Sequence, residues 1–155
     1  MSESEIPRNI IAAIERLWPE GVVERFDETQ SYFEPIRPRL EQNLRDLRGA
    51  SLRPAEAAAQ VTGEWQSFHV FSIIPGDDES QTAYALGVSK AAPFAVLNAT
   101  AGNLRSQIAA VLKKYRIVLL DQSILDLPVD GLSAGEAVLL EEPVRVVDAF
   151  FFRGT

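Results

Sequence analysis

The chain has 155 residues, a typical length for one domain, and its hydrophobic content of 46% is ordinary for a globular protein. It contains one histidine, His69, and no cysteine, which excludes thiolate nucleophiles, disulfides and metal sites built from several Cys or His ligands. Its net charge of −7 argues against a nucleic-acid partner, because binding to nucleic acid usually requires a basic surface.

Apolar residues at helical spacing predict helices in the first part of the chain. Three are expected, over residues 6–18, 35–48 and 54–61. Pro19 ends the first helix, and residues 22–34 fit no pattern. The regular part of the second helix begins as late as Pro38, and Gly49 and Gly63 follow the second and third helices as terminators.

The sequence changes character at Glu64. Aromatic and β-branched residues predict a strand over 65–74, and alternation of large and small residues predicts another over 81–89. A polar turn at 75–80 joins the two strands into a hairpin. Because the second strand has one face of small residues, we expect another element to pack closely over that face.

After residue 90 the pattern predicts one long helix and further strands. Residues 94–97 form either a third strand or the approach to this helix, which spans 104–115 and has Thr100 as its expected N-cap. The other predicted elements are a buried strand at 117–120, a loop at 121–132, a short helix from the capping-box pattern Ser133–Glu136 to about Leu140, and a final strand at 144–152.

Together these elements predict an α+β fold, in which N-terminal helices pack on a four- or five-stranded antiparallel or mixed sheet and one long helix precedes the last strands. A hairpin alone is marginally stable in water. We therefore expect residues 1–155 to form a single domain, with a helical part at 1–63 and a sheet-containing part at 64–155.

Candidate catalytic residues are few. The run Gly87–Ala91 resembles a nucleophile elbow around Ser89, but Ala91 stands where the motif has its second glycine, and His69 precedes the serine instead of following it. A catalytic Ser89–His69 pair is therefore disfavoured, and His69 is expected to be a half-buried strand residue. We predict no catalytic residue and no cofactor. We also predict no metal site, because the acidic turn at 77–79 lacks EF-hand spacing.

Three consecutive phenylalanines, Phe150–Phe152, make the final predicted strand apolar on both faces. Such a strand is either covered on both sides or exposed at an interface. We favour the covered strand, with a homodimer formed through Phe150–Phe152 as the alternative.

Charge is unevenly distributed along the chain. Residues 1–30 carry a net charge of −4 and residues 117–155 a net charge of −5, whereas residues 91–116 carry +4. The acidic N-terminus lacks the apolar stretch of a secretory signal, and no apolar run reaches the roughly 20 residues that span a bilayer. We therefore expect a cytoplasmic protein with no membrane contact. The segment Tyr115–Gly131 resembles small bacterial toxin-immunity proteins in layout, a resemblance that carries no residue role.

The leading hypothesis is a non-catalytic, acidic protein-binding domain, most concretely an immunity- or antitoxin-type inhibitor that docks on a basic partner. Its contact candidates are Glu20, Glu24, Asp27, Glu28, Asp77, Asp78, Glu79, Asp121, Asp126 and Asp130. One alternative is a small-ligand-binding protein or small enzyme with a pocket at the hairpin, formed by His69, Tyr84, Ser89 and Asn98. Another is a structural subunit of a larger assembly.

Overall fold

The computed structural model describes residues 6–24, 31–47, 50–53, 65–75, 84–97, 103–136, 138 and 140–154. Its helices are α1 (Arg8–Leu17), α2 (Phe33–Arg45), α3 (Asn103–Lys113), α4 (Gln122–Leu125) and α5 (Val146–Phe150). Its strands are β1 (Val22–Val23), β2 (Ala50–Arg53), β3 (Trp65–Gln66), β4 (Phe68–Pro75), β5 (Tyr84–Ser89), β6 (Phe94–Leu97), β7 (Val118–Leu119), β8 (Ser133–Ala134) and β9 (Arg153–Gly154).

The centre of the fold is a mixed five-stranded sheet with the strand order β2-β4-β5-β6-β7. The first four strands pair antiparallel, and β6 pairs with β7 in parallel. Two smaller pairings join distant parts of the chain, β1 with β8 and β3 with β9. The predicted α+β class with a mixed five-stranded sheet is confirmed, and β4 and β5 form the predicted hairpin. Residues 94–97 are a strand, the first of their two predicted alternatives.

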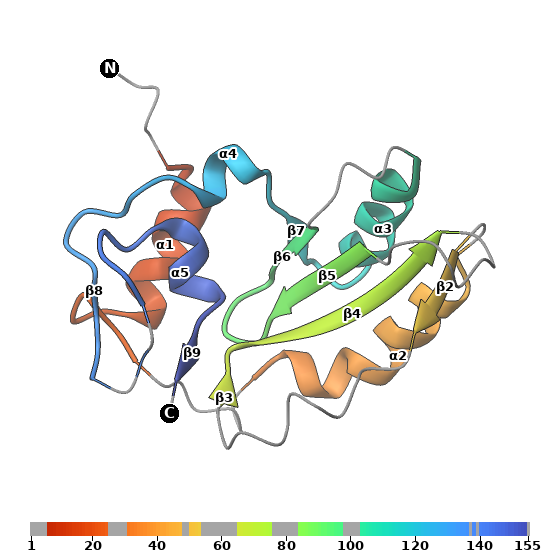
Figure 1. The fold of residues 1–155 in the computed structure, drawn as a ribbon, viewed down its shortest axis with the longest axis horizontal. Coiled ribbons are helices and arrows are strands. Elements are labelled where there is room, and N and C mark those ends of the chain that lie inside the picture. Colours follow the sequence, from red (N-terminus) through yellow and green to blue (C-terminus); the bar gives the residue numbers. More distant parts are fainter. Residues whose placement is uncertain are drawn as a thin grey trace.

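Helices α2 and α3 cover one face of this sheet (Figure 1). Because side chains alternate along a strand, Phe71 and its neighbour two residues on, Ile73, both point toward these helices. We call the resulting cluster the sheet core. Its buried members are Phe33, Leu40, Leu44, Phe71, Ile73, Leu86, Val88, Ala95, Leu97, Leu104, Ile108, Val111, Leu112 and Ile117.

A second core joins α1 to the C-terminal segment, beside one end of the sheet (Figure 1). Ile10 and Ile14, one helical turn apart on α1, are both buried in it. The indole Nε1 of Trp18 donates a hydrogen bond to the Ala149 carbonyl at 3.1 Å. We call this cluster the terminal core. Its buried members are Ile10, Ile14, Trp18, Val23, Ala92, Phe94, Leu120, Leu125, Leu132, Val138, Val144, Val146, Ala149, Phe150 and Phe152.

Helix α2 begins two residues before its predicted start. Its first backbone N–H, that of Phe33, donates to the Ser31 hydroxyl at 3.1 Å. Pro35 lies in the first turn, where a missing N–H costs little because no carbonyl of the helix would accept from it. Pro38 lies inside the helix, so the two prolines do not delay the helix as the sequence pattern predicted.

The final strand predicted at 144–152 is wrong, because the segment forms helix α5. The carboxylate of Asp148 accepts the Arg145 backbone N–H at 2.9 Å, which closes a first helical turn at a point where β-branched residues favour a strand. The helix and the bend after it direct the three phenylalanines to different neighbours. Phe150 contacts Phe94, Phe151 contacts Phe68, and Phe152 contacts Trp18.

The packing of Phe150 and Phe152 fits the favoured alternative, in which this segment is covered, and the homodimer through Phe150–Phe152 stays a prediction. Phe150 is 0% and Phe152 is 1% exposed, and both side chains lie in the terminal core of their own chain. The backbone of this C-terminal segment is also hydrogen-bonded, because the backbone N–H of Ser67 donates to the Phe152 carbonyl at 2.9 Å.

The helix predicted from Ser133 to about Leu140 is also wrong at its start. Residues Ser133–Ala134 form β8, which pairs in parallel with β1. The backbone N–H groups of Ser133 and Gly135 donate to the carbonyls of Gly21 and Val23, both at 2.8 Å. Pairing with a strand distant in the sequence therefore overrides the local capping pattern. Gly21 has a φ of 75° and no room for a Cβ, which would lie 2.6 Å from the Gly131 carbonyl oxygen.

Several predictions fall outside the described residues. They concern the helix at 54–61, most of the turn at 75–80, the N-cap Thr100, and the candidate residues Asp27, Glu28, Asp77, Asp78, Glu79 and Asn98. Within the described part, the predicted loop at 121–132 contains the short helix α4, and β1 and β2 are strands that the sequence pattern did not indicate.

Candidate functional site

The structure separates two of the residues considered for a hairpin pocket. His69 is paired with Val88 and Ser89 with Phe68, so adjacent positions in the register place His69 and Ser89 on opposite faces of the sheet. Tyr84 lies on the His69 face, because it pairs with Ile73. His69 and Ser89 therefore cannot act on one bound molecule from the same side of the hairpin.

His69 packs among aromatic rings. Its imidazole lies edge-on to Phe71, with ring centroids 4.6 Å apart, and 5.6 Å from the Phe33 ring. Burial lowers the pKa of His69 below its usual value, and the positive charges of Arg37 and Lys90 lower the pKa further. The imidazole is therefore neutral at pH 7, in agreement with the expected half-buried strand residue.

Ser89 is fully buried and its hydroxyl is engaged. It donates to the Phe150 carbonyl at 2.8 Å and accepts the backbone N–H groups of Ala91 and Ala92 at 3.1 and 3.3 Å. The hydroxyl of Ser67, also fully buried, donates to the same Phe150 carbonyl at 2.9 Å. The two serines form a serine clamp that holds the C-terminal segment on the hairpin, which accounts for a buried hydroxyl without a catalytic role.

The face of small residues on β5 is covered at Gly87, as predicted. A Cβ at this glycine would lie 3.3 Å from Val96 and 3.9 Å from the ring of Phe151. The partly buried Tyr32 hydroxyl donates a 2.6 Å hydrogen bond to the Ser89 carbonyl oxygen. Burial raises the pKa of Tyr32, so this hydroxyl stays protonated and acts as a hydrogen-bond donor.

Formal charge differs between the part of the chain around the terminal core and the part around the sheet core. We define the acidic half as residues 6–24 and 117–154, which surround the terminal core and carry ten acidic and four basic residues. We define the basic half as the described residues between 31 and 116; the full sequence over 31–116 carries eight acidic and ten basic residues. The formal net charge is therefore −6 for the acidic half and +2 for residues 31–116. The acidic half is expected to have a negative surface potential.

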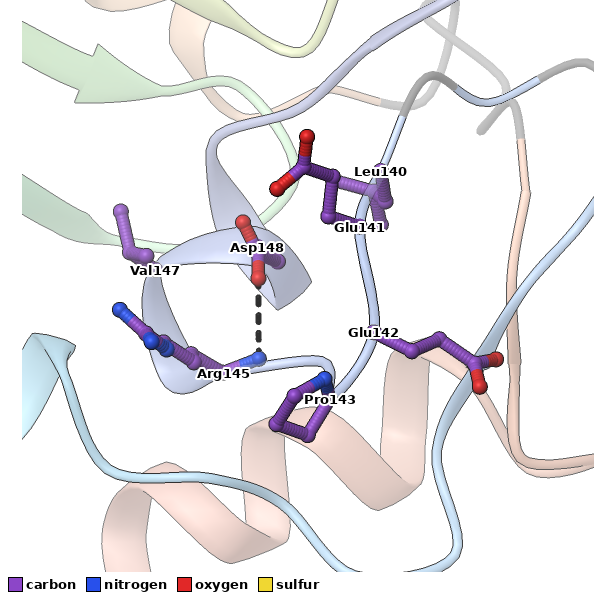
Figure 2. A pocket seen from close by; sticks show the side chains of 7 residues that line it. All are labelled: Leu140, Glu141, Glu142, Pro143, Arg145, Val147 and Asp148. Atoms are coloured by element: carbon purple, nitrogen blue, oxygen red, sulfur yellow. Dashed lines mark hydrogen bonds between the residues drawn. The ribbon is translucent and has the colours of Figure 1, made fainter.

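Three surface cavities lie in the acidic half, and each is lined by at least two carboxylates. The first, of about 310 Å³, is the α5 cavity, lined by Leu140, Glu141, Glu142, Pro143, Arg145, Val147 and Asp148 (Figure 2). The second, of about 560 Å³, is the α1 groove, lined by Ile6, Arg8, Ile11, Ile14, Glu15, Pro128, Val129 and Asp130. The third, of about 550 Å³, is the β8 cavity, lined by Val22, Glu24, Ser133, Ala134, Gly135 and Glu136.

The carboxylates of the α5 cavity differ in how they are held. Asp148 is fixed by the Arg145 backbone N–H, which donates to it at the start of α5 (Figure 2). Glu141 and Glu142 are exposed, and the Glu142 side chain points away from Asp148 (Figure 2). The Glu142–Pro143 peptide bond is cis. None of these three cavities is lined by His69, Tyr84 or Ser89.

The predicted contact residues that the structure describes all lie exposed in the acidic half. They are Glu20, Glu24, Asp121, Asp126 and Asp130. Two of them are already paired: Asp121 accepts a 3.0 Å hydrogen bond from Arg105, and Asp126 accepts one of 2.9 Å from Gln122. Glu24 and Asp130 line the β8 cavity and the α1 groove.

Five further acidic residues line these cavities and were not among the predicted contact residues. They are Glu15, Glu136, Glu141, Glu142 and Asp148, which lie in segments of net negative charge, and this charge was the available signal. Their convergence depends on the contacts between α1 and the C-terminal segment, which no local pattern encodes. In the described part of the chain, no group of three or more acidic or histidine side chains is placed to hold a metal ion.

Comparison with known proteins finds no matching family model, no similar curated protein and no similar solved structure. Among the helices that the structure describes, none is both long and apolar enough to cross a membrane.

Proposed function

We propose that this protein is an acidic docking domain that binds a basic partner protein through its acidic half. The observation that carries the proposal is that the surface cavities lie in the negatively charged part of the molecule. The three cavities described above lie where the formal charge is −6, and seven carboxylate residues line them against two arginines. Cavities lined by carboxylates fit the guanidinium and ammonium groups of a basic surface.

The most concrete form of the proposal is an immunity- or antitoxin-type inhibitor. An inhibitor needs a stable, complementary surface and no chemistry of its own, and acidic inhibitors match basic toxins such as nucleases. The described serine and histidine candidates have structural roles that fit this proposal, because Ser89 anchors the C-terminal segment and His69 packs in the sheet core region. The lack of cysteine fits a cytoplasmic setting.

Charge reversal tests the proposal. The acidic variant replaces two exposed glutamates of different cavities, Glu136→Lys and Glu141→Lys. A matched control, Glu34→Lys with Asp46→Lys, changes the net charge equally at exposed positions of the basic half. Each tagged protein is used at low salt to capture partners from cells that naturally produce it, and the captured partner is purified and titrated by calorimetry.

We expect one dominant basic partner that binds the wild-type chain and the control variant alike, and that binds the acidic variant at least about tenfold more weakly. Affinity falls with added salt, because the contacts are between exposed charges. Equal affinity of all three proteins, or a dominant partner that is itself acidic, contradicts the proposal.

A further inference from the structure

The α1 groove differs from the other two cavities because its floor is apolar. Three isoleucines of the α1 region line it together with Pro128 and Val129, which come from the segment after α4. Ile14 is only 6% exposed and belongs to the terminal core, so the floor of the groove is continuous with the packed interior.

Ile11 leaves apolar surface open to solvent in this groove. It is 39% exposed, and in the described part of the chain it is one of two large hydrophobic residues with this degree of exposure. The other, Val118, is 47% exposed and lines none of the three cavities. An exposed isoleucine beside a large surface cavity is a feature of binding surfaces, where burial of such a residue strengthens the complex.

The rim of the groove is charged. Glu15 and Asp130 are exposed carboxylates, and neither forms an ion pair with another described residue. Arg8 is the single basic residue that lines the groove. The rim therefore carries a net negative charge inside the acidic half, and it favours cationic groups on both sides of an apolar centre.

We infer that the α1 groove is the anchor point of the interface and receives a large apolar side chain, such as leucine or phenylalanine, from a segment of the partner where lysine or arginine flanks it. This inference rests on the proposed function and adds the chemistry of one contact. Protein interfaces concentrate their binding energy in such apolar anchors, which a charged rim surrounds. Charge complementarity selects the basic partner as the occupant instead of a second copy of this acidic chain.

Methyl NMR on the full chain tests the inference with defined probes. The isoleucine δ1-methyl groups are labelled, and the chain is titrated with three capped peptides, RKLFKR, RKSSKR and EELFEE. We expect RKLFKR to shift the methyl signals of Ile6, Ile11 and Ile14 in a saturable manner. The peptides without the apolar pair or without the basic flanks should bind at least about tenfold more weakly.

A pair of variants gives the matched control. Ile11→Ser removes the exposed apolar surface of the groove, and Val118→Ser removes a comparable exposed residue elsewhere. Because both side chains are exposed, both variants should fold, which thermal unfolding checks. RKLFKR should lose at least about tenfold in affinity for Ile11→Ser and keep its affinity for Val118→Ser.

Three results overturn the inference. The first is equal binding of RKLFKR and RKSSKR, and the second is equal loss with both variants. The third is a set of Ile11 shifts that depend on protein concentration without peptide, which would assign the groove to a second copy. None of them removes the proposed docking function, which fails on its own test, namely equal partner affinity of the charge-reversed variants.

Discussion

The two halves of the molecule are stabilised in different ways. In the basic half, the regular hydrogen bonds of β2, β4, β5 and β6 carry the structure, and two helices of 13 and 11 residues cover one face. In the acidic half, α1 is the one described helix longer than five residues, and the strands have two residues each. Isolated hydrogen bonds between distant residues replace the regular ladders there, such as that from Trp18 to Ala149.

This difference has a consequence for function. A sheet covered by helices fixes the position of most of its side chains through regular packing. The acidic half has many turns and short elements, so its backbone forms cavities and its exposed carboxylates lie around them. Binding residues are often placed on loops supported by a rigid scaffold, and the acidic half has that relation to the sheet.

The largest expected effect follows from removing a side chain at the join between the halves. Phe150 is 0% exposed and its ring centroid lies 4.8 Å from that of Phe94 on β6. We expect Phe150→Ala to lower the free energy of unfolding by about 3–5 kcal/mol, because it leaves a large cavity in the terminal core. Urea unfolding measures this change, and a loss below about 1 kcal/mol would show that the core relaxes around the site.

The serine clamp should have the next largest effect. Ser67→Ala and Ser89→Ala each remove a donor to the buried Phe150 carbonyl, and we expect each to cost about 1–3 kcal/mol in the free energy of unfolding. The double variant should cost more than either, because the carbonyl then loses both donors. Ser106→Ala, at an exposed position of α3, is the control and should change stability by less than about 0.5 kcal/mol. Serine effects as small as this control would contradict the clamp.

These residues also show what the sequence can predict. Alternation along 81–89 and helical spacing along 104–115 predict β5 and α3, because each pattern reports a repeated contact with one core. The predictions for Ser133–Glu136 and 144–152 are wrong for different reasons. Pairing with the distant strand β1 decides the first segment, and the hydrogen bond from the Arg145 backbone N–H to Asp148 closes a helical turn in the second. Ser133 has a capping pattern that pairing with β1 overrides, and Phe150–Phe152 meet three different neighbours.

The candidate site shows the same limit. The net negative charge of the N-terminal and C-terminal segments predicted acidic contact surfaces. The exposed positions of Glu24 and Asp130 fit that prediction. The α1 groove was not predictable, because it forms where α1 meets Pro128–Asp130, more than 100 residues further along the chain. Ile11 resembles a core residue in the sequence pattern, and only the packing of α1 shows that it faces solvent.

A smaller effect is expected in the basic half. Arg116, after the end of α3, has a φ of 61°, in the left-handed region that favours glycine, and the backbone N–H of Ile117 donates to the Leu112 carbonyl across it. We expect Arg116→Gly to raise the free energy of unfolding by about 0.5–1 kcal/mol. Lys113→Gly, at the last residue of α3, should lower it by less than about 1 kcal/mol. Thermal unfolding compares the two, and a loss for Arg116→Gly would indicate that the arginine side chain stabilises this turn.

The smallest effect concerns pH. Because the pKa of His69 is lowered in the folded state, the unfolded chain binds the proton more readily below the ordinary histidine pKa of about 6.5. The stability contribution of the neutral imidazole is therefore complete above that value and is lost as the pH falls toward the lowered pKa. We expect the difference in Tm between pH 8 and pH 5.5 to be smaller in His69→Phe than in the wild-type chain. If the difference in Tm is the same in both proteins, the loss of stability at low pH is due to the carboxylates and not to His69.

The comparison of the two halves is tested most directly by the partner affinity of the two charge-reversed proteins, measured by calorimetry at one salt concentration. The variant that carries Glu136→Lys and Glu141→Lys should bind at least about tenfold more weakly than the wild-type chain, and the variant that carries Glu34→Lys and Asp46→Lys should bind as the wild type does. A greater loss from the basic-half variant would place the interface at the other end of the molecule and contradict the account.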